Sequence, residues 1–328
     1  MKPAALSKRY TVAIVVLLAL TTAGWFVWHT REPHYEGRAV SYWVEQLLHD
    51  NSKAREALRN IGPAAVPALA RVVNRRRSPF WAHLEKWRPK LPAFIARKIP
   101  NRALDQLLQE RAIDVLFGFG PAAAPAVPAL VGVDASLNDF IGFGSAGLAH
   151  ATLLQIGPAG LPYFIELLKS VDPNIRAKAA SYIGHLGSQA GPAAPALARA
   201  LTDSNPSVRN SAVTALGQIG ALAGAALPGL KAALGMYDDS FRLAVIDALW
   251  KTGRESTTTV PILIRILSDQ RNPNRAGAAT LLGEFGPAAR AALPALTNVL
   301  AEEFSYTRVK AEEALRKIDA QPATGAAP

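Results

Sequence analysis

Proline returns every 33 residues through the second half of the chain, each time at the start of a short apolar stretch. The series is Pro162, Pro195, Pro228, Pro261 and Pro294, with arginine in step at Arg176, Arg209, Arg242, Arg275 and Arg308 and glycine at Gly187, Gly220, Gly253 and Gly286. A fixed period of this length indicates a supersecondary unit that buries its apolar face only by stacking on its neighbours. The period therefore predicts a solenoid.

One repeat, residues 203–235, predicts two helices joined by a turn. Residues 203–205 supply polar N-cap side chains, and Pro206 suits the first helical position, where a missing N–H costs no hydrogen bond. The helix that follows carries an apolar stripe: Val208, Ala212, Ala215, Leu216 and Ile219. We expect Gly220 to end this helix in a left-handed conformation and Pro228 to begin the second. The predicted fold is an all-α, right-handed α-solenoid of such hairpins.

A second signature, an apolar residue followed by Gly-Pro, occurs in four places. These are Ile61-Gly62-Pro63, Phe119-Gly120-Pro121, Ile156-Gly157-Pro158 and Phe285-Gly286-Pro287. The segments DSNPSVRNSAVTALGQIG and DPNIRAKAASYIGHLG each combine an acidic cap, an arginine, alanines and a closing glycine. In these motifs the chain resembles the HEAT-repeat family, especially its short, phycobilisome-lyase-like subtype, over about residues 41–319. The resemblance implies a scaffold fold and leaves the function unspecified.

The N-terminal segment predicts a membrane anchor that precedes the repeats. Residues 11–28 carry no charge, and about 20 apolar residues in a helix cross a bilayer. Lys2, Lys8 and Arg9 lie before this segment, so the positive-inside rule places residues 1–10 in the cytoplasm and exports the repeats to the periplasmic side. The alternative is a signal peptide cleaved near Ala23, which would also export them.

The 33-residue period fails between Pro67 and Pro128, where residues 74–102 are inserted. This insertion carries nine Lys and Arg residues against one acid, Glu85, within a chain of net charge +11. It is either a helical hairpin packed on the first repeats, a membrane-surface element, or a patch for an anionic partner. The candidate patch comprises Arg75, Arg76, Arg77, Trp81, Lys86, Trp87, Arg88, Lys90, Arg97 and Lys98.

These features divide the chain into consecutive segments. They are a cytoplasmic tail (1–10), a transmembrane anchor (11–30), a linker (31–40), a first repeat with a capping helix (41–73), the insertion (74–102), further repeats (103–302), a C-terminal capping helix (303–319) and a disordered tail (320–328).

The residues that usually carry catalysis are sparse or badly spaced. There is no cysteine, and none of the six histidines has another at i+3 or i+4 or stands beside a glutamate, so metal-ligand spacing is missing. No phosphate-binding loop or nucleophile motif occurs. We therefore expect no enzyme activity, cofactor or metal. The alternative is a lyase-like HEAT-fold enzyme that uses the insertion in its site.

The predicted function is a membrane-anchored scaffold for protein–protein interaction, and nucleic acid is an unlikely partner because the repeats are neutral as a group. Second helices commonly line the concave face of such arrays. One candidate binding residue lies on each: Glu166, Arg199, Lys231, Arg265 and Asn298. The arginine series fits either a stripe for an acidic partner or a structural ladder that bonds helix ends and cap acids, and the ladder is the preferred interpretation.

Overall fold

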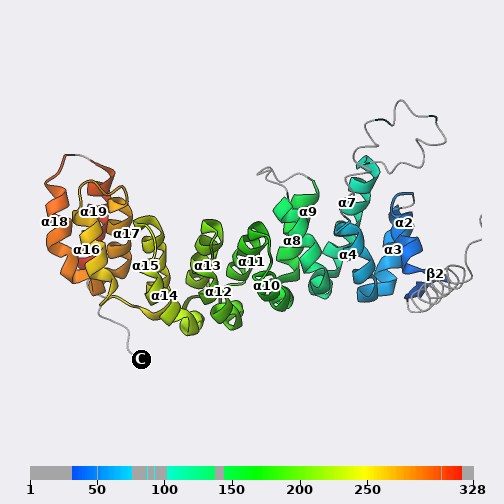
Figure 1. Cartoon of the computed structure of the whole chain (residues 1–328), viewed down its shortest axis with the longest axis horizontal. Helices are drawn as coiled ribbons and strands as arrows, with labels where there is room; N and C mark the ends of the chain where they lie inside the picture. Colours follow the sequence, from blue (N-terminus) through cyan, green and yellow to red (C-terminus); the bar gives the residue numbers. More distant parts are fainter. Residues whose placement is uncertain are drawn as a thin grey trace, which may run out of the picture. The chain divides into compact units, whose positions relative to one another are not determined.

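The computed structural model describes residues 32–49, 51–75, 87, 92, 102–136, 144–303 and 305–319. In this part of the chain, short helices follow one another through tight turns (Figure 1). The chain forms two compact units, residues 1–156 and 157–328. The predicted all-α architecture of helical hairpins is confirmed, while its right-handed sense stays a prediction.

The described part of the first unit begins with a small β-hairpin inside the predicted linker. Strands β1 (His34–Tyr35) and β2 (Arg38–Ala39) pair antiparallel, with His34 opposite Ala39. The turn between them places Glu36 and Gly37 at φ values of 49° and 71°, which two-residue hairpin turns require. Within the predicted linker, residues 34–39 therefore form a hairpin that leads directly into helix α2 (Val40–Gln46).

The helices of the first unit pack as successive layers. They are α2 (Val40–Gln46), α3 (Asn51–Ile61), α4 (Val66–Val73), α7 (Arg102–Phe119), α8 (Val127–Ser136) and α9 (Ser145–Ile156), with 3-10 turns η1 (Gly62–Ala65) and η3 (Gly120–Ala126). Helix α4 packs on α7, and α7 and α8 both pack on α9. The predicted Gly-Pro signature falls in the turns: Gly62 and Gly120 have φ values of 72° and 53°.

The second unit consists of two rows of helices. The first-helix row comprises α11 (Pro173–His185), α13 (Pro206–Ile219), α15 (Asp239–Gly253), α17 (Arg275–Phe285) and the C-terminal cap α19 (Tyr306–Asp319). The second-helix row comprises α10 (Leu161–Leu167), α12 (Ala194–Ala200), α14 (Leu227–Ala233), α16 (Thr259–Ser268) and α18 (Leu293–Leu300). The turns are η4 (Gly157–Gly160), η5 (Gly187–Ala193), η6 (Gly220–Ala226) and η7 (Gly286–Ala292). In Figure 1, α11 and α13 lie side by side.

The boundaries of helix α13 lie at the cap residue, the proline and the glycine that the sequence analysis singled out. Asn205 caps α13 by accepting a hydrogen bond from the Ser207 N–H at 2.9 Å, with Pro206 next in the chain. The apolar stripe predicted for this helix is buried. Gly220, which ends the helix, has a φ of 68°. These features agree with the prediction.

Gly253 differs in conformation from the other glycines of its periodic series. It is the last residue of helix α15, and the left-handed conformation falls on the next residue, Arg254, at a φ of 54°. A Cβ at position 253 would lie 2.9 Å from a side-chain carbon of Leu227, so this glycine allows a close approach instead of a turn. A 3-10 turn like η6 or η7 does not follow it in this described repeat.

Candidate functional site

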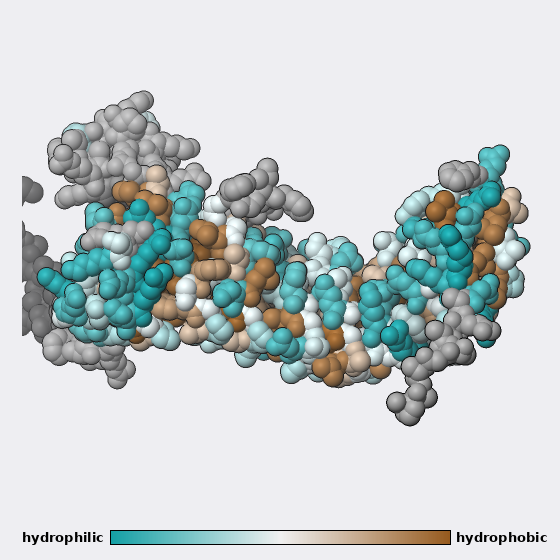
Figure 2. Space-filling view, turned by 180° about the vertical axis from the view of Figure 1, so that it is seen from behind, coloured by the Kyte–Doolittle hydropathy of each residue, from teal (hydrophilic) through white to brown (hydrophobic). Residues whose placement is uncertain are grey.

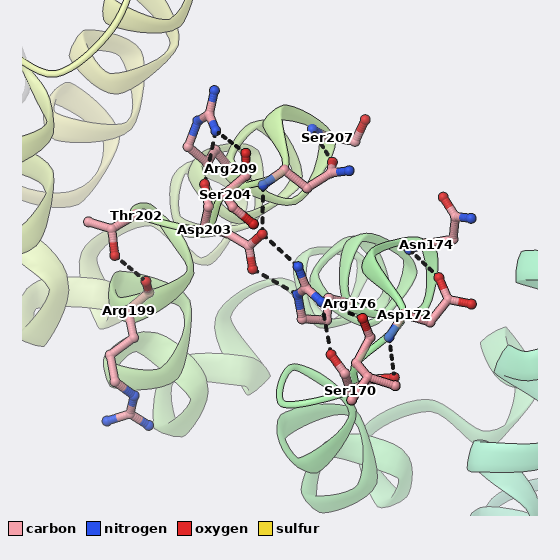
Figure 3. A network of polar contacts seen from close by, with 12 residues as sticks. Ser170, Asp172, Asn174, Arg176, Arg199, Thr202, Asp203, Ser204, Ser207 and Arg209 are labelled. Atoms are coloured by element: carbon pink, nitrogen blue, oxygen red, sulfur yellow. Dashed lines mark hydrogen bonds and ion pairs between the residues drawn. The ribbon is translucent and has the colours of Figure 1, made fainter.

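Two members of the arginine series, Arg176 and Arg209, belong to a polar network in the second unit (Figure 3). Arg176 donates from Nε and Nη2 to the two carboxylate oxygens of Asp203, each at 2.7 Å. Its Nη1 donates to the carbonyl oxygens of Ser170, at 2.9 Å, and Val171, at 3.2 Å. One guanidinium thus joins the loop before its own helix to the loop before the next.

Asp203 also bonds to the start of the following helix, α13. Its Oδ1 also accepts from the Asn205 N–H at 2.8 Å, and Asn205 is the N-cap of α13. The hydrogen bonds from Arg176 hold the pKa of Asp203 below its ordinary value, and the pKa of Arg176 is raised in turn. The carboxylate therefore stays ionised, and it positions the start of the next repeat.

The other arginines of the series bond to carboxylates, backbone carbonyls or an aromatic ring near their own helices. Arg275 pairs through two nitrogens with Glu302 and donates to the Leu267 carbonyl at 2.8 Å. That pairing lowers the pKa of Glu302. Arg209 donates to the Asp203 carbonyl at 2.9 Å, and its guanidinium lies over the Tyr237 ring at 4.0 Å. Arg242 donates to the Leu234 carbonyl at 2.7 Å and pairs with Asp239. Arg308 donates to Glu312 at 3.3 Å. All five guanidiniums have partners within the fold, as a structural ladder requires.

The candidate binding residues lie one per helix on the second-helix row, and all are exposed. Glu166 pairs with Lys169 and Lys231 with Glu255, both at 2.7 Å, while Arg265 approaches Asp239 at 3.8 Å. The Arg199 guanidinium points away from the ladder network (Figure 3). Asn298 is exposed near the end of α18. Whether this row forms a concave surface stays a prediction.

The basic patch predicted in residues 74–102 lies mostly outside the described residues. Arg75 is exposed just after α4, and the Trp87 side chain is 50% exposed in a helical conformation. Arg76, Arg77, Trp81, Lys86, Arg88, Lys90, Arg97 and Lys98 fall outside. So do the predicted anchor, residues 11–30, and the tail, residues 320–328.

Two described stretches, Ala103–Ala135 and Pro206–Ala233, are long and apolar enough to cross a membrane. Each joins two helices through a glycine of positive φ, Gly120 at 53° and Gly220 at 68°, and both contribute to the packed core. Both stretches therefore have the apolar, partly buried character of helical hairpins in a protein core. Among the described residues, no cluster of three His, Asp or Glu side chains could hold a metal ion.

A feature that sequence analysis missed lies between α15 and α17. Neighbouring first helices elsewhere approach closely at a glycine: a Cβ added to Gly184 would lie 3.0 Å from the Ala215 Cα, and one added to Gly283 would lie 2.9 Å from the Ala314 Cα. Gly217 faces Ala248 in the same way. Small residues in this pair of positions allow two helix backbones to pack directly together.

The α15–α17 contact has large residues in both positions. Counting 33 residues from Gly217 leads to Trp250, and counting 33 from Ala248 leads to Leu281. The Trp250 ring stacks on Phe285, with centroids 4.3 Å apart, and the Arg254 guanidinium lies over the Trp250 ring, 4.7 Å from its centroid. Helices α15 and α17 pack less closely than the other neighbouring first helices of this unit, as large side chains in these positions would require. The sequence did contain a signal: Trp250 stands at a repeat position that is glycine in three other repeats, at Gly184, Gly217 and Gly283.

The separation leaves an open groove of about 350 Å³, which we call the α15–α17 groove. Its lining combines aliphatic and polar side chains: Leu243, Asp247, Lys251, Gly277, Thr280, Leu281 and Glu284. A groove of this size accepts one or two side chains of a partner.

Comparison with known proteins identifies the repeats. Residues 161–250 and 227–316 match the family of HEAT repeats. A search of curated proteins found no match. Among solved structures, a mutant of Kap121p is similar at 14% identity with a TM-score of 0.50, over 84% of this chain and 33% of that one.

Two smaller structures are also similar. An engineered protein has 19% identity and a TM-score of 0.43, over 85% of this chain and 78% of that one. The complex of CpcE and CpcF of phycocyanin lyase from Nostoc sp. PCC7120 has 21% identity and a TM-score of 0.35, over 63% of this chain and 89% of that one. At these identities the likeness concerns the fold alone, and this chain spans about a third of Kap121p.

Proposed function

We propose that this chain with HEAT repeats is a non-catalytic scaffold that binds a protein partner through the second-helix row. The observation that carries the proposal is the placement of one exposed polar side chain on each of the five helices of the second-helix row, in repeats that the arginine ladder links to one another. A preorganised surface loses less conformational entropy on binding than a mobile one.

The character of the surface supports a partner that binds reversibly. On the face drawn in Figure 2, apolar and polar residues are interspersed. Arg199, on the second-helix row, projects freely, and arginine is enriched where proteins meet. Non-obligate interfaces have this mixed composition. A protein partner of this kind is therefore the function that the repeats support best.

The proposal extends to location: residues 11–30 anchor the chain in the inner or plasma membrane, and the repeats lie on the exported side. The support is the uncharged run of residues 11–28 and the cations that precede it. The proposal of a non-catalytic role rests on the sequence, where nucleophile motifs and metal-ligand spacings are missing.

A photo-crosslinking amino acid placed at Arg199 and at Asn298 of the full chain, in its native membrane, tests the binding face. We expect one discrete adduct of the same mass shift from both positions. Asn210, exposed on α13 of the first-helix row, is the control and should give none. No adduct from the second-helix row, or an equal yield from Asn210, would refute the proposed face.

Location has a separate test, because the chain contains no cysteine. A membrane-impermeant maleimide should label Ser188→Cys on intact cells and should label Ser7→Cys only after permeabilisation. Labelling of Ser7→Cys from outside, or of Ser188→Cys only after permeabilisation, would contradict the proposed orientation.

A further inference from the structure

The α15–α17 groove has an apolar floor and a rim of charged side chains. Leu243 from α15 and Leu281 from α17 supply aliphatic carbon, and the Leu243 Cδ1 packs against Gly277, 2.8 Å from the place that a Cβ would take. Lys251 pairs with Asp247 at 2.7 Å, and the Lys251 Cδ lies 3.6 Å from the place of a Cβ on Gly217 of α13. Its charge is thus engaged at one edge of the groove.

Two carboxylate groups of the groove keep unused hydrogen-bonding capacity. The Asp247 Oδ1 is shielded from solvent and accepts no hydrogen bond in the described part of the chain. Glu284 is exposed, and no ion pair is formed with it by the described residues. Lys317 leans over Gly283, on the α19 side, without pairing with Glu284. Both carboxylates line the groove, and the exposed Glu284 is the one that an incoming cation can reach.

From this chemistry we propose that the α15–α17 groove is a docking site for a peptide segment of a partner protein that combines aliphatic side chains with a lysine or arginine. The aliphatic groups lie on Leu243 and Leu281, and the cation pairs with the exposed carboxylate of Glu284. A basic side chain also carries a long aliphatic stem that suits such a floor. The groove belongs to the first-helix row, so this proposal stands independently of the second-helix face.

The shape of the groove favours a peptide over a small metabolite. Sites for small molecules enclose most of the ligand surface, whereas this groove is open to solvent. An extended or helical segment gains affinity from several side chains in succession, and so does not need enclosure.

The test uses the purified full chain and three fluorescein-labelled dodecapeptides, with binding followed by fluorescence polarisation. The first peptide has a central pair of leucines flanked by lysines; the second has glutamates in place of the lysines; the third has alanines in place of the leucines. We expect the first peptide to bind at least about tenfold more tightly than the other two, which is a difference of about 1.4 kcal/mol.

Matched variants locate the binding, because the 33-residue period supplies equivalent positions outside the groove. Glu284→Lys should abolish the preference for the lysine peptide, whereas Gln218→Lys, at the same position of α13, should leave it unchanged. Thr280→Trp should fill the groove and weaken binding about tenfold, whereas Thr214→Trp, again on α13, should not. Circular dichroism checks that each variant is folded.

The proposal is overturned if the lysine peptide shows no preference. It is equally overturned if Gln218→Lys reduces binding as much as Glu284→Lys, because the effect would then be general electrostatics. These results leave the crosslinking at Arg199 and Asn298 untouched, so the failure of one proposal is distinguishable from the failure of the other.

Discussion

Arg176 and Asp203 stand 27 residues apart and form two parallel hydrogen bonds of 2.7 Å. Their side chains are only 15% and 14% exposed. The pair joins two consecutive repeats, because Asp203 also receives the N–H of the residue that caps α13. In a linear array, such nearest-neighbour contacts carry much of the stability.

Replacing Asp203 with Ala should lower the free energy of unfolding by about 1.5–3 kcal/mol, since it leaves a mostly buried guanidinium with fewer acceptors. Urea denaturation measures the loss. Glu166→Ala is the matched control, because Glu166 and Lys169 also lie 2.7 Å apart but are 71% and 65% exposed. That change should cost at most about 0.5 kcal/mol. If both variants lost the same unfolding free energy, the Arg176–Asp203 bonds would contribute no more than an exposed ion pair.

The stability of the repeats should fall in acid. Arg176 lowers the folded-state pKa of Asp203, and Arg275 lowers that of Glu302. A lowered folded pKa stabilises the fold above the unfolded pKa, about 3.9 for Asp and 4.3 for Glu, and this stabilisation is lost as pH falls through the folded value. Unfolding free energies measured from about pH 6 to pH 3 should decline, less steeply in Asp203→Asn and least in the double variant with Glu302→Gln. Identical slopes in all three proteins would contradict this account.

Two glycines of α17 should respond oppositely to alanine. A Cβ on Gly283 would lie 2.9 Å from the Ala314 Cα, a backbone atom that cannot move aside, so Gly283→Ala should destabilise by roughly 1–3 kcal/mol. On Gly277 the near atom is the Leu243 Cδ1 at 2.8 Å, the tip of a mobile side chain. Gly277→Ala should therefore be neutral or stabilising by up to about 1 kcal/mol, because alanine favours the helix. Thermal melting distinguishes the two, and destabilisation of equal size would refute the distinction.

Trp250 should matter more to stability than its partial exposure suggests. Its ring fills the space between α15 and α17 and stacks on the buried Phe285. Trp250→Ala should lower the free energy of unfolding by roughly 3 kcal/mol, the lower end for tryptophan truncation. Leu222→Ala, at a residue 62% exposed, serves as the control and should stay within about 0.5 kcal/mol. A loss within the control range would mean that Trp250 does not support the interface.

The sequence predicted the repeat architecture because its signals are local. Pro206 and Asn205 act on the helix that they begin, and Gly220 acts on the one that it ends, so each boundary can be read within a few residues. The apolar stripe of α13 follows from helical spacing alone. Gly253 shows the limit: its role depends on Leu227, 26 residues earlier, and only packing reveals that contact.

The candidate site was predicted less completely. Four of the five exposed residues named on the second-helix row share one repeat position, and all five lie on second helices that the period predicts. The α15–α17 groove could not, because its existence depends on how far apart two helices stand. That distance depends on side-chain volume on both sides of an interface, and here Trp250 of α15 stacks on Phe285 of α17.

By itself, therefore, the sequence determined the unit, its period, its caps and the places where arginines recur. Tertiary structure alone decided which atoms those arginines bond and where the regular stacking opens into a groove. The physical reason is that helix formation depends on neighbours three and four residues away, whereas helix spacing depends on steric fit between repeats. Among the described repeats of the second unit, that fit changes between α15 and α17, where the Trp250 ring stacks on Phe285.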